Sequence, residues 1–175
     1  MMRVFKGCAH FATICTLFLL TSHPAFAANW EFTTWGMTVA EVEAASKRKA
    51  VPCDADTCSN MSGHADRAML SMPLQADGFD LVAVFNFDRK SDLLTAVILR
   101  PKNKRDNTRW AIAQRIKLKA TYGPWKEEQW FGIPTWKWKW DDGEIRLTET
   151  TKYDMDIANV AYISKAWLEA IAADE

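Results

Sequence analysis

Acidic residues gather in one short stretch, PTWKWKWDDGEIRL, which contains Asp141, Asp142 and Glu144. Carboxylates held as a pair can supply the acid and the nucleophile or base of glycoside hydrolysis. Acids are also common in hairpin turns, and Asp142 is followed by Gly143, a dipeptide typical of a tight turn between strands. A carboxylate-dependent hydrolase is therefore one interpretation of this stretch, and a structural turn is the other.

The histidine content restricts other kinds of catalysis. His64 is the only histidine after residue 27, whereas serine and cysteine nucleophiles usually need a nearby base, most often histidine. The sequence around it, NMSGH, lacks the flanking glycines of a nucleophile elbow. Cys53, Cys58 and His64 supply fewer soft ligands than a structural zinc site needs. We therefore predict that the protein is not an enzyme and holds no metal or cofactor.

Three tryptophans occupy alternate positions of the same stretch, and alternate residues of a strand point to the same face. A two-residue turn at Asp142-Gly143 predicts a register that pairs Trp140 with Ile145, Trp138 with Leu147 and Trp136 with Glu149. Trp138 and Trp140 then oppose apolar partners and are predicted to be core residues. Trp136, opposite a glutamate, is predicted to reach the surface. The same register sets Lys139 against Arg146, which is unfavourable unless that face meets water or an anion.

Surface tryptophans and neighbouring cations are the candidate binding residues. Tryptophan, tyrosine and arginine contribute most of the binding energy at protein interfaces, and exposed aromatic rings also line ligand sites. The candidate binding residues are Trp125, Trp130, Trp136, Lys137, Lys139 and Arg109. A protein partner is the main hypothesis. A glycan stacked on the three tryptophans of this set is the alternative.

The charge of the chain is unevenly distributed. Without residues 1–27, which contain Arg3 and Lys6 and no acid, the formal charge is 20 − 22 = −2, which does not favour nucleic acid as a partner. The segment 100–119 nevertheless carries eight cations and the single acid Asp106; the cations are Arg100, Lys102, Lys104, Arg105, Arg109, Arg115, Lys117 and Lys119. Such a segment could meet an anionic surface of the cell envelope, or form a solvated loop and helix face.

The first 27 residues have the pattern of a secretory signal peptide. A basic start is followed by an apolar stretch over residues 11–20 and by Ala25-Phe26-Ala27. This stretch is shorter than the roughly 20 residues that span a bilayer. We expect cleavage after Ala27, a single domain over residues 28–175 without a transmembrane segment, and a periplasmic or secreted location. Cys53 and Cys58 are then expected to form a disulfide, as is usual outside the cytoplasm.

The elements that must position these residues begin with a helix. Thr38 and Glu41 have the spacing of a capping box, so a helix should start there and run to about Lys47. Three strands are expected at 68–74, 79–87 and 93–100, with Asp77-Gly78 as the first turn. On the middle strand alternate residues starting with Phe79 are apolar, so one face should be more buried than the other.

The pattern then recurs along the second half of the chain. Asp106 or Asn107 can cap a second helix, which ends at Gly123-Pro124. Its expected apolar stripe consists of Ile112, Ala113, Ile116 and Ala120. Strands follow at 135–140, 144–150 and 157–163, and a short helix closes the chain. The predicted fold is α+β, with two helix-plus-three-strand units forming one antiparallel sheet and the helices packed on one face.

These elements resemble small periplasmic helix-and-sheet modules. The stretch Trp35-Gly36-Met37-Thr38, the exit Tyr122-Gly123-Pro124 and the Trp-rich hairpin carry the resemblance. It points to the outer-membrane assembly lipoproteins of the SmpA type and to the β-lactamase inhibitor protein fold, families that bind proteins through loops or a sheet surface. The chain departs from the lipoproteins in having no lipidated cysteine. The resemblance implies a periplasmic binding or inhibitor-like module that contacts another envelope protein.

Overall fold

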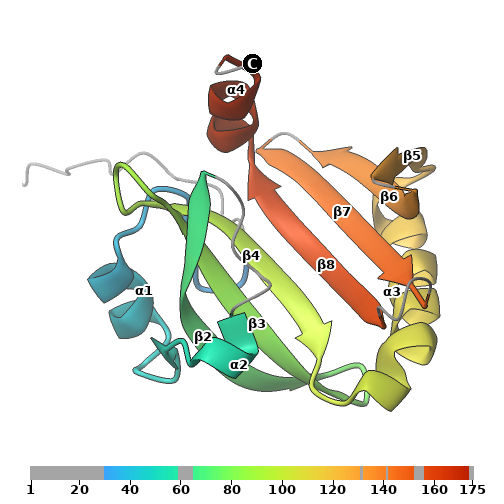
Figure 1. Ribbon diagram of the computed structural model, residues 1–175, viewed down its shortest axis with the longest axis horizontal. Helices are drawn as coiled ribbons and strands as arrows, with labels where there is room; N and C mark the ends of the chain where they lie inside the picture. The colour runs from blue at the N-terminus through green and yellow to red at the C-terminus, as the bar shows by residue number, and fades with distance from the viewer. Residues whose placement is uncertain (1–29, 59–64, 131, 141, 152–155, 174–175) are drawn as a thin grey trace, which may run out of the picture.

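The computed structural model describes residues 30–58, 65–130, 132–140, 142–151 and 156–173. The predicted signal peptide and His64 lie outside these ranges. The described chain forms one antiparallel sheet of eight strands with helices beside it, so the predicted α+β class is confirmed (Figure 1). None of the described helices is both long and apolar enough to cross a membrane.

The sheet has the strand order β1-β2-β3-β4-β8-β7-β6-β5. The strands are β1 Val51–Pro52, β2 Asp66–Ala76, β3 Phe79–Asp88, β4 Leu94–Pro101, β5 Lys126–Trp130, β6 Ile133–Trp140, β7 Gly143–Thr150 and β8 Ile157–Ser164. The helices are α1 Val39–Ala45, α2 Ala55–Cys58, the 3-10 turn η1 Lys104–Asp106, α3 Asn107–Tyr122 and α4 Lys165–Ala173. Each half of the chain forms a meander, and the two meanders meet where β4 pairs with β8.

The predicted pair of helix-plus-three-strand units is not confirmed, because each half contributes four strands. The additional strands are the two edges of the sheet. β1 has only two residues, and one of them is Pro52, which cannot donate to a ladder. β5 has the sequence KEEQW, which lacks an alternating apolar pattern. Short or charged edge strands of this kind also discourage pairing with other chains.

Helix α1 begins as its sequence predicts. The Thr38 amide donates to Oε2 of Glu41 at 2.8 Å, and the Glu41 amide donates to Oγ1 of Thr38 at 3.4 Å, which completes the capping box. The helix ends at Ala45, two residues before the predicted end, because Lys47 and Arg48 adopt left-handed φ values of 55° and 61°.

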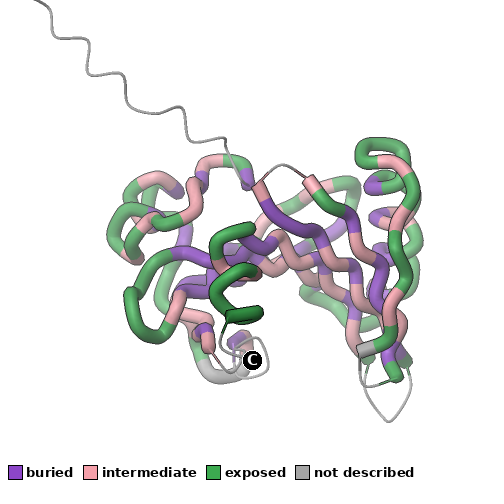
Figure 2. Tube along the Cα trace, turned by 90° about the horizontal axis from the view of Figure 1, so that it is seen from above, coloured by how far each residue is buried: buried purple, intermediate pink, exposed green. Residues whose placement is uncertain are grey.

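The first hairpin also follows its turn residues. Ala76 pairs with Phe79, and Asp77 and Gly78 have φ values of 52° and 79°, as a two-residue primed turn requires. Alternate residues of β3 from Phe79 to Phe87 are buried. They share one core with Val42 of α1 and with α3, so both helices lie on the same face of the sheet. Figure 2 shows that the strands carry most of the buried residues, whereas no residue of α4 is buried.

Helix α3 packs on the sheet through a different stripe from the one predicted. Its buried residues are Asn107, Trp110, Ala111, Gln114 and Leu118. Ile116, predicted to face the core, is 65% exposed, and Ile112 is exposed as well. The large ring of Trp110 and the side chain of Leu118 define the packing face. Burying them turns the two isoleucines outward, since one helix face cannot bury both sets.

Gly143 is required where β6, β7 and β8 come together. A Cβ atom at this position would lie 1.9 Å from the carbonyl oxygen of Ile163, on the neighbouring strand. Backbone atoms of a paired strand cannot move aside as a flexible side chain can. At Gly78, in contrast, a Cβ would meet nothing within 4 Å, and only the positive φ disfavours a side chain.

We predict that Gly143→Ala lowers the free energy of unfolding by about 3 kcal/mol or more, because it overpacks the β7–β8 pairing. Gly78→Ala is the matched control and should lower it by about 1 to 2 kcal/mol, the cost of a left-handed alanine. Urea denaturation followed by circular dichroism measures both values. Equal losses in the two variants would contradict the close approach at Gly143.

Candidate functional site

The candidate binding residues separate onto the two faces of the sheet. Trp125 and Trp136 lie on the face that α3 covers, and Arg109 belongs to α3 itself. Lys137 and Lys139 alternate with the tryptophans of β6 and therefore point to the opposite face. Trp130 is the last residue of β5, and the structure does not describe its side chain. The five candidates whose side chains the structure describes consequently do not form one continuous site.

The prediction that Trp136 reaches the surface is wrong. Trp140 pairs with Gly143, so the hairpin loop is 141–142, and every partner on β7 shifts by two residues from the predicted register. A shift of two preserves the faces but sets Trp136 opposite buried Leu147. Only 8% of Trp136 is exposed, and the guanidinium of Arg115 lies 4.7 Å from its ring centroid.

The other tryptophans on this face pack against the chain itself. Trp138 is 2% exposed, which confirms that it is a core residue, and its Nε1 donates to the carbonyl of Gly123 at 3.1 Å. Trp125 meets Trp138 edge-to-face, with ring centroids 6.0 Å apart. Lys119 Nζ lies 5.2 Å from the Trp125 ring, and Arg109 covers Phe79 at 4.9 Å. Cations of α3 thus cover aromatic rings that a glycan platform would need to expose.

Charged side chains occupy the opposite face of β5, β6 and β7. Strand pairing places them together: Lys126 opposes Lys137, Lys137 opposes Arg146, and Lys139 opposes Glu144. Paired residues share a face. We call the following six residues the charged face: Lys126, Glu128, Lys137, Lys139, Glu144 and Arg146. Four cations and two acids give it a net charge of 4 − 2 = +2.

Salt bridges order most of the charged face. Lys137 forms a salt bridge with Glu128 and lies 3.9 Å from Glu144, so it connects the two acids. Glu128 also pairs with Lys126 at 2.9 Å, and Arg146 Nε donates to Glu144 at 2.5 Å. The predicted clash between Lys139 and Arg146 does not occur. Lys137 faces Arg146 instead, and Glu144 lies within reach of both.

Hydrogen bonds between these groups change the proton affinity of two of them. The Lys137 ammonium, and then that of Lys126, donates to the Glu128 carboxylate and lowers its pKa to about 2. The same contact with Glu128 raises the pKa of Lys126. The acid therefore stays ionised and keeps the lysine side chains in place. Lys139 is exposed and forms no salt bridge with any described residue.

Apolar side chains continue the same face toward the middle of the sheet. The register places Ala161 and Ile163 of β8 beside Arg146 and Glu144, and Ile98 of β4 beside Ala161. Ala161 and Ile98 are half-buried, and Ile163 is buried. The face therefore changes from charged strands at one edge to aliphatic strands at its centre.

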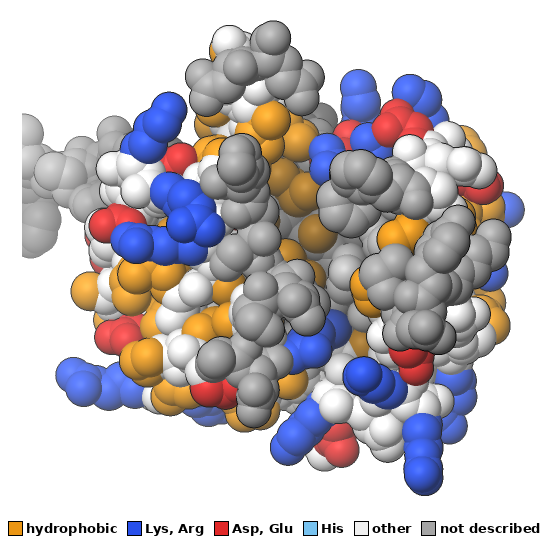
Figure 3. Space-filling view, in the orientation of Figure 1, with side chains coloured by type: hydrophobic (Ala, Val, Ile, Leu, Met, Phe, Trp, Pro, Cys, Tyr) orange, Lys and Arg blue, Asp and Glu red, His pale blue; other side chains and the backbone are white. Residues whose placement is uncertain are grey.

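Helix α4 adds further apolar surface at the end of β8. Its amide at Lys165 donates to the carbonyl of Asp142 at 2.9 Å, which fastens the helix beside the β6–β7 turn. None of its residues is buried; Trp167 and Leu168 are half-buried and Ile171 is 38% exposed. In Figure 3 hydrophobic side chains run from α4 onto the strands beneath it, with Lys and Arg side chains on both sides.

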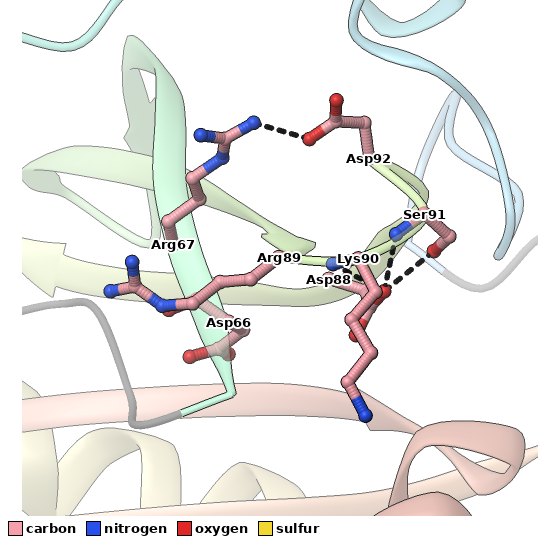
Figure 4. A network of polar contacts seen from close by, with 7 residues as sticks. All are labelled: Asp66, Arg67, Asp88, Arg89, Lys90, Ser91 and Asp92. Atoms are coloured by element: carbon pink, nitrogen blue, oxygen red, sulfur yellow. Dashed lines mark hydrogen bonds and ion pairs between the residues drawn. The ribbon is translucent and has the colours of Figure 1, made fainter.

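A second polar cluster lies where β3 turns into β4 (Figure 4). The Asp88 carboxylate accepts hydrogen bonds from the amides of Lys90 and Ser91, at 3.0 and 2.6 Å, and from the Ser91 hydroxyl at 2.8 Å. These bonds, chiefly that of the Ser91 hydroxyl, hold the pKa of Asp88 below its usual value. This is how an aspartate closes a turn on its own backbone.

The remaining members of this cluster attach the turn to β2. Arg67 forms a salt bridge with Asp92, and Arg89 Nε donates to the carbonyl of Asp66 at 3.1 Å. Asn86 Nδ2 donates to the Asp66 carboxylate at 3.2 Å. Each of these acids already interacts with a donor of the chain itself. The cluster is therefore explained by the folding of this turn, and we assign it no ligand.

The acids considered for glycoside hydrolysis do not form a free pair. Glu144 is buried and salt-bridged to Arg146, and Asp142 lies in the β6–β7 turn. Asp141 lies outside the described residues. Among the residues that the structure describes, histidine, cysteine and acidic side chains do not gather into a group of three that could hold a metal ion. Cys53 and Cys58 lie at disulfide distance, with Cα atoms 5.9 Å apart, as predicted.

Comparisons of the chain with protein families, with curated proteins and with solved structures find no match. The function is therefore inferred from the geometry above.

We predict that the Glu128 salt bridges make a pH-dependent contribution to stability. The pKa of Glu128 is lowered on folding from 4.5 to about 2, so the contribution is complete above about pH 4.5 and disappears as the pH falls toward 2. The difference in melting temperature between the wild type and Glu128→Gln should therefore shrink over this range. Thermal denaturation by circular dichroism at several pH values measures it.

Glu127→Gln is the matched control, since Glu127 is an exposed neighbour on the same strand. Its difference from the wild type should remain small at every pH, as is usual for surface substitutions. A Glu128→Gln effect that does not change between neutral pH and pH 2 would contradict the salt bridges.

Proposed function

We propose that the protein is an exported, non-catalytic binding module that contacts another envelope protein through the charged face and the apolar surface beside it. The observation that carries this proposal is the charged face itself. Six charged side chains share one face of three adjacent strands, on the side opposite α3. On the other face Trp136 and Trp138 are buried in the core, and Trp140, predicted to be a core residue, is only partly buried against it.

The composition of this surface supports contact with a protein. Protein interfaces combine an apolar centre with a polar rim, and complementary charges set the orientation and speed of association. Here the aliphatic residues of β8 and β4 and the apolar side of α4 lie next to the charged strands. The partner protein would therefore contact both apolar and charged side chains at fixed positions on this surface.

The ordering of the lysines also supports binding. A flexible lysine loses rotamer freedom when it is immobilised at an interface, at about 0.5–1.5 kcal/mol for each such side chain. Lys137 is already held between Glu128 and Glu144, and its side chain is only 20% exposed. Lys137 therefore loses much of its rotamer freedom on folding, and little is left to lose on binding. Lys139 is left to pair with an acid of the partner, because the charged face has an excess of two cations.

The location of the partner follows from the sequence. Residues 1–27 predict export, and the Cys53–Cys58 pair is typical of oxidising compartments. His64 is the only histidine after residue 27, and histidine is the most common general base, which favours binding over catalysis.

We further propose that the two halves of the chain are related units, each with a helix and four strands. Helix α1 precedes β1–β4 and helix α3 precedes β5–β8, and the sheet order is reversed in the second half. This arrangement supports the resemblance to small periplasmic helix-and-sheet modules, which remains a prediction.

Site-specific photocrosslinking in the cell envelope tests the proposed function. A photoreactive amino acid replaces Lys139 on the charged face or, as the control, Ile112, which is exposed on α3. We expect position 139 to yield one defined protein adduct, identified by mass spectrometry, that position 112 does not yield. The proposal is wrong if position 139 gives only adducts with cell-wall glycan or lipid, or the same adducts as position 112.

A further inference from the structure

The structure separates the eight cations of segment 100–119 into two groups. Five of them interact with other parts of the chain. Arg100 donates to the carbonyl of Thr57, Arg109 pairs with Asp106 and covers Phe79, Arg115 covers Trp136, Lys117 pairs with Asp77, and Lys119 covers Trp125. Four of these five cations are the cations of α3, so the positive charge of that helix takes part in the folding of the chain.

The other three cations are Lys102, Lys104 and Arg105, which we call the basic corner. All three are exposed, and their side chains form no hydrogen bond or salt bridge with any described residue. They lie together where β4 ends and η1 leads into α3. In Figure 3 Lys and Arg side chains gather along the lower right edge, where β4 passes to α3.

The backbone under the basic corner is well defined. The Lys102 amide donates to the carbonyl of Asp80 at 2.9 Å, and the Arg105 amide donates to Oδ1 of Asn103 at 3.0 Å. The two nearby acids interact with other residues: Asp80 accepts from Gln75 at 2.8 Å, and Asp106 pairs with Arg109 at 2.9 Å. Three cations are thus held close together on an ordered turn, without an acid of their own.

The rest of the chain has the opposite net charge, so the positive charge is concentrated in one segment. Segment 100–119 has a formal charge of 8 − 1 = +7, and the chain without residues 1–27 has −2, so the remainder carries −2 − 7 = −9. An anionic surface would repel the remainder and attract the basic corner. The corner is exposed, with no aromatic or apolar residue among its three cations, so it suits an extended layer of phosphate groups better than a single small molecule.

We propose that the basic corner binds the anionic lipid surface of a membrane. Strand pairing shows what this would do to the orientation of the molecule. β4 and β8 are antiparallel, so the end of β4 lies beside the start of β8, and α4 follows from the far end of β8. A molecule attached through the basic corner would therefore present α4 away from the membrane.

Binding to lipid vesicles tests this proposal. The protein is mixed with vesicles of equal parts phosphatidylglycerol and phosphatidylcholine, or of phosphatidylcholine alone, and bound protein is measured by sedimentation. We expect binding to the anionic vesicles only, and a loss of binding as salt is raised. Each lysine or arginine at an anionic surface contributes about fivefold in affinity, so the triple variant Lys102→Gln, Lys104→Gln, Arg105→Gln should bind on the order of 100-fold more weakly.

Lys47→Gln, Arg48→Gln, Lys49→Gln is the matched control, because it removes the same charge from three exposed, adjacent cations at the end of α1. It should change the affinity about threefold or less, since these residues lie outside the proposed contact. Circular dichroism melting curves establish that both triple variants are folded.

Three results would overturn the proposal. They are wild-type binding that is absent or equal for both kinds of vesicle, equal losses in the two triple variants, and displacement by inorganic phosphate beyond that caused by chloride at the same ionic strength. The last result would indicate a site for free phosphate instead of a lipid surface. All of these outcomes are independent of the protein contact proposed for the charged face.

Discussion

The pairing of β4 with β8 joins the two halves of the molecule, and the remaining architecture depends on it. Four residue pairs, from Ala96↔Ile163 to Leu99↔Val160, connect two meanders that otherwise lie in separate parts of the sequence. Helix α3 strengthens this joint, since it packs on β7 and β8 of its own half and also reaches β4 of the other. One sheet with one shared core results, and both α1 and α3 contribute to that core. Separated at β4–β8, each half would expose a large part of this apolar surface to water.

Helices α1 and α3 cover one face of the sheet, and the charged face of β5, β6 and β7 lies on the other, where the proposed partner would bind. The sequence WKWKW of β6 illustrates the division, because alternate residues of a strand point to opposite sides. Trp136 and Trp138 enter the core under α3, whereas Lys137 and Lys139 join the charged face. Cations of α3 then cover aromatic rings from outside, which explains why so basic a helix can pack on so aromatic a sheet. Trp136 and Trp138 are consequently core residues, and the proposed binding role moves to the lysines between them.

Local chemistry made much of this fold predictable from the sequence, and long-range packing limited the rest. The capping box at Thr38, the Asp77-Gly78 turn and the core position of Trp138 depend on neighbouring residues or on simple alternation, and all three were predicted correctly. The edge strands β1 and β5 were not predicted, because they lack an apolar pattern of their own and form by pairing with the neighbouring strand. The prediction of the hairpin register was wrong because two turns are possible. Both two-residue turns, 141–142 and 142–143, have suitable turn residues and place the same residues on each face. Trp136 lies on the α3 face in either register, and its burial depends on α3, whose Arg115 lies over its ring.

The central claim is that the tryptophan face of β6 is core, so that recognition falls to the opposite, charged face. Incorporation of 5-fluorotryptophan followed by fluorine NMR tests it most directly, with the resonances assigned by Trp136→Phe and Trp138→Phe substitutions. The solvent isotope shift between H2O and D2O reports whether each indole contacts water. We expect both resonances to show almost none of the shift that the same label shows in the urea-unfolded protein. A full shift for Trp136 would show that its ring is exposed, and would contradict the account by making Trp136 a candidate binding residue again.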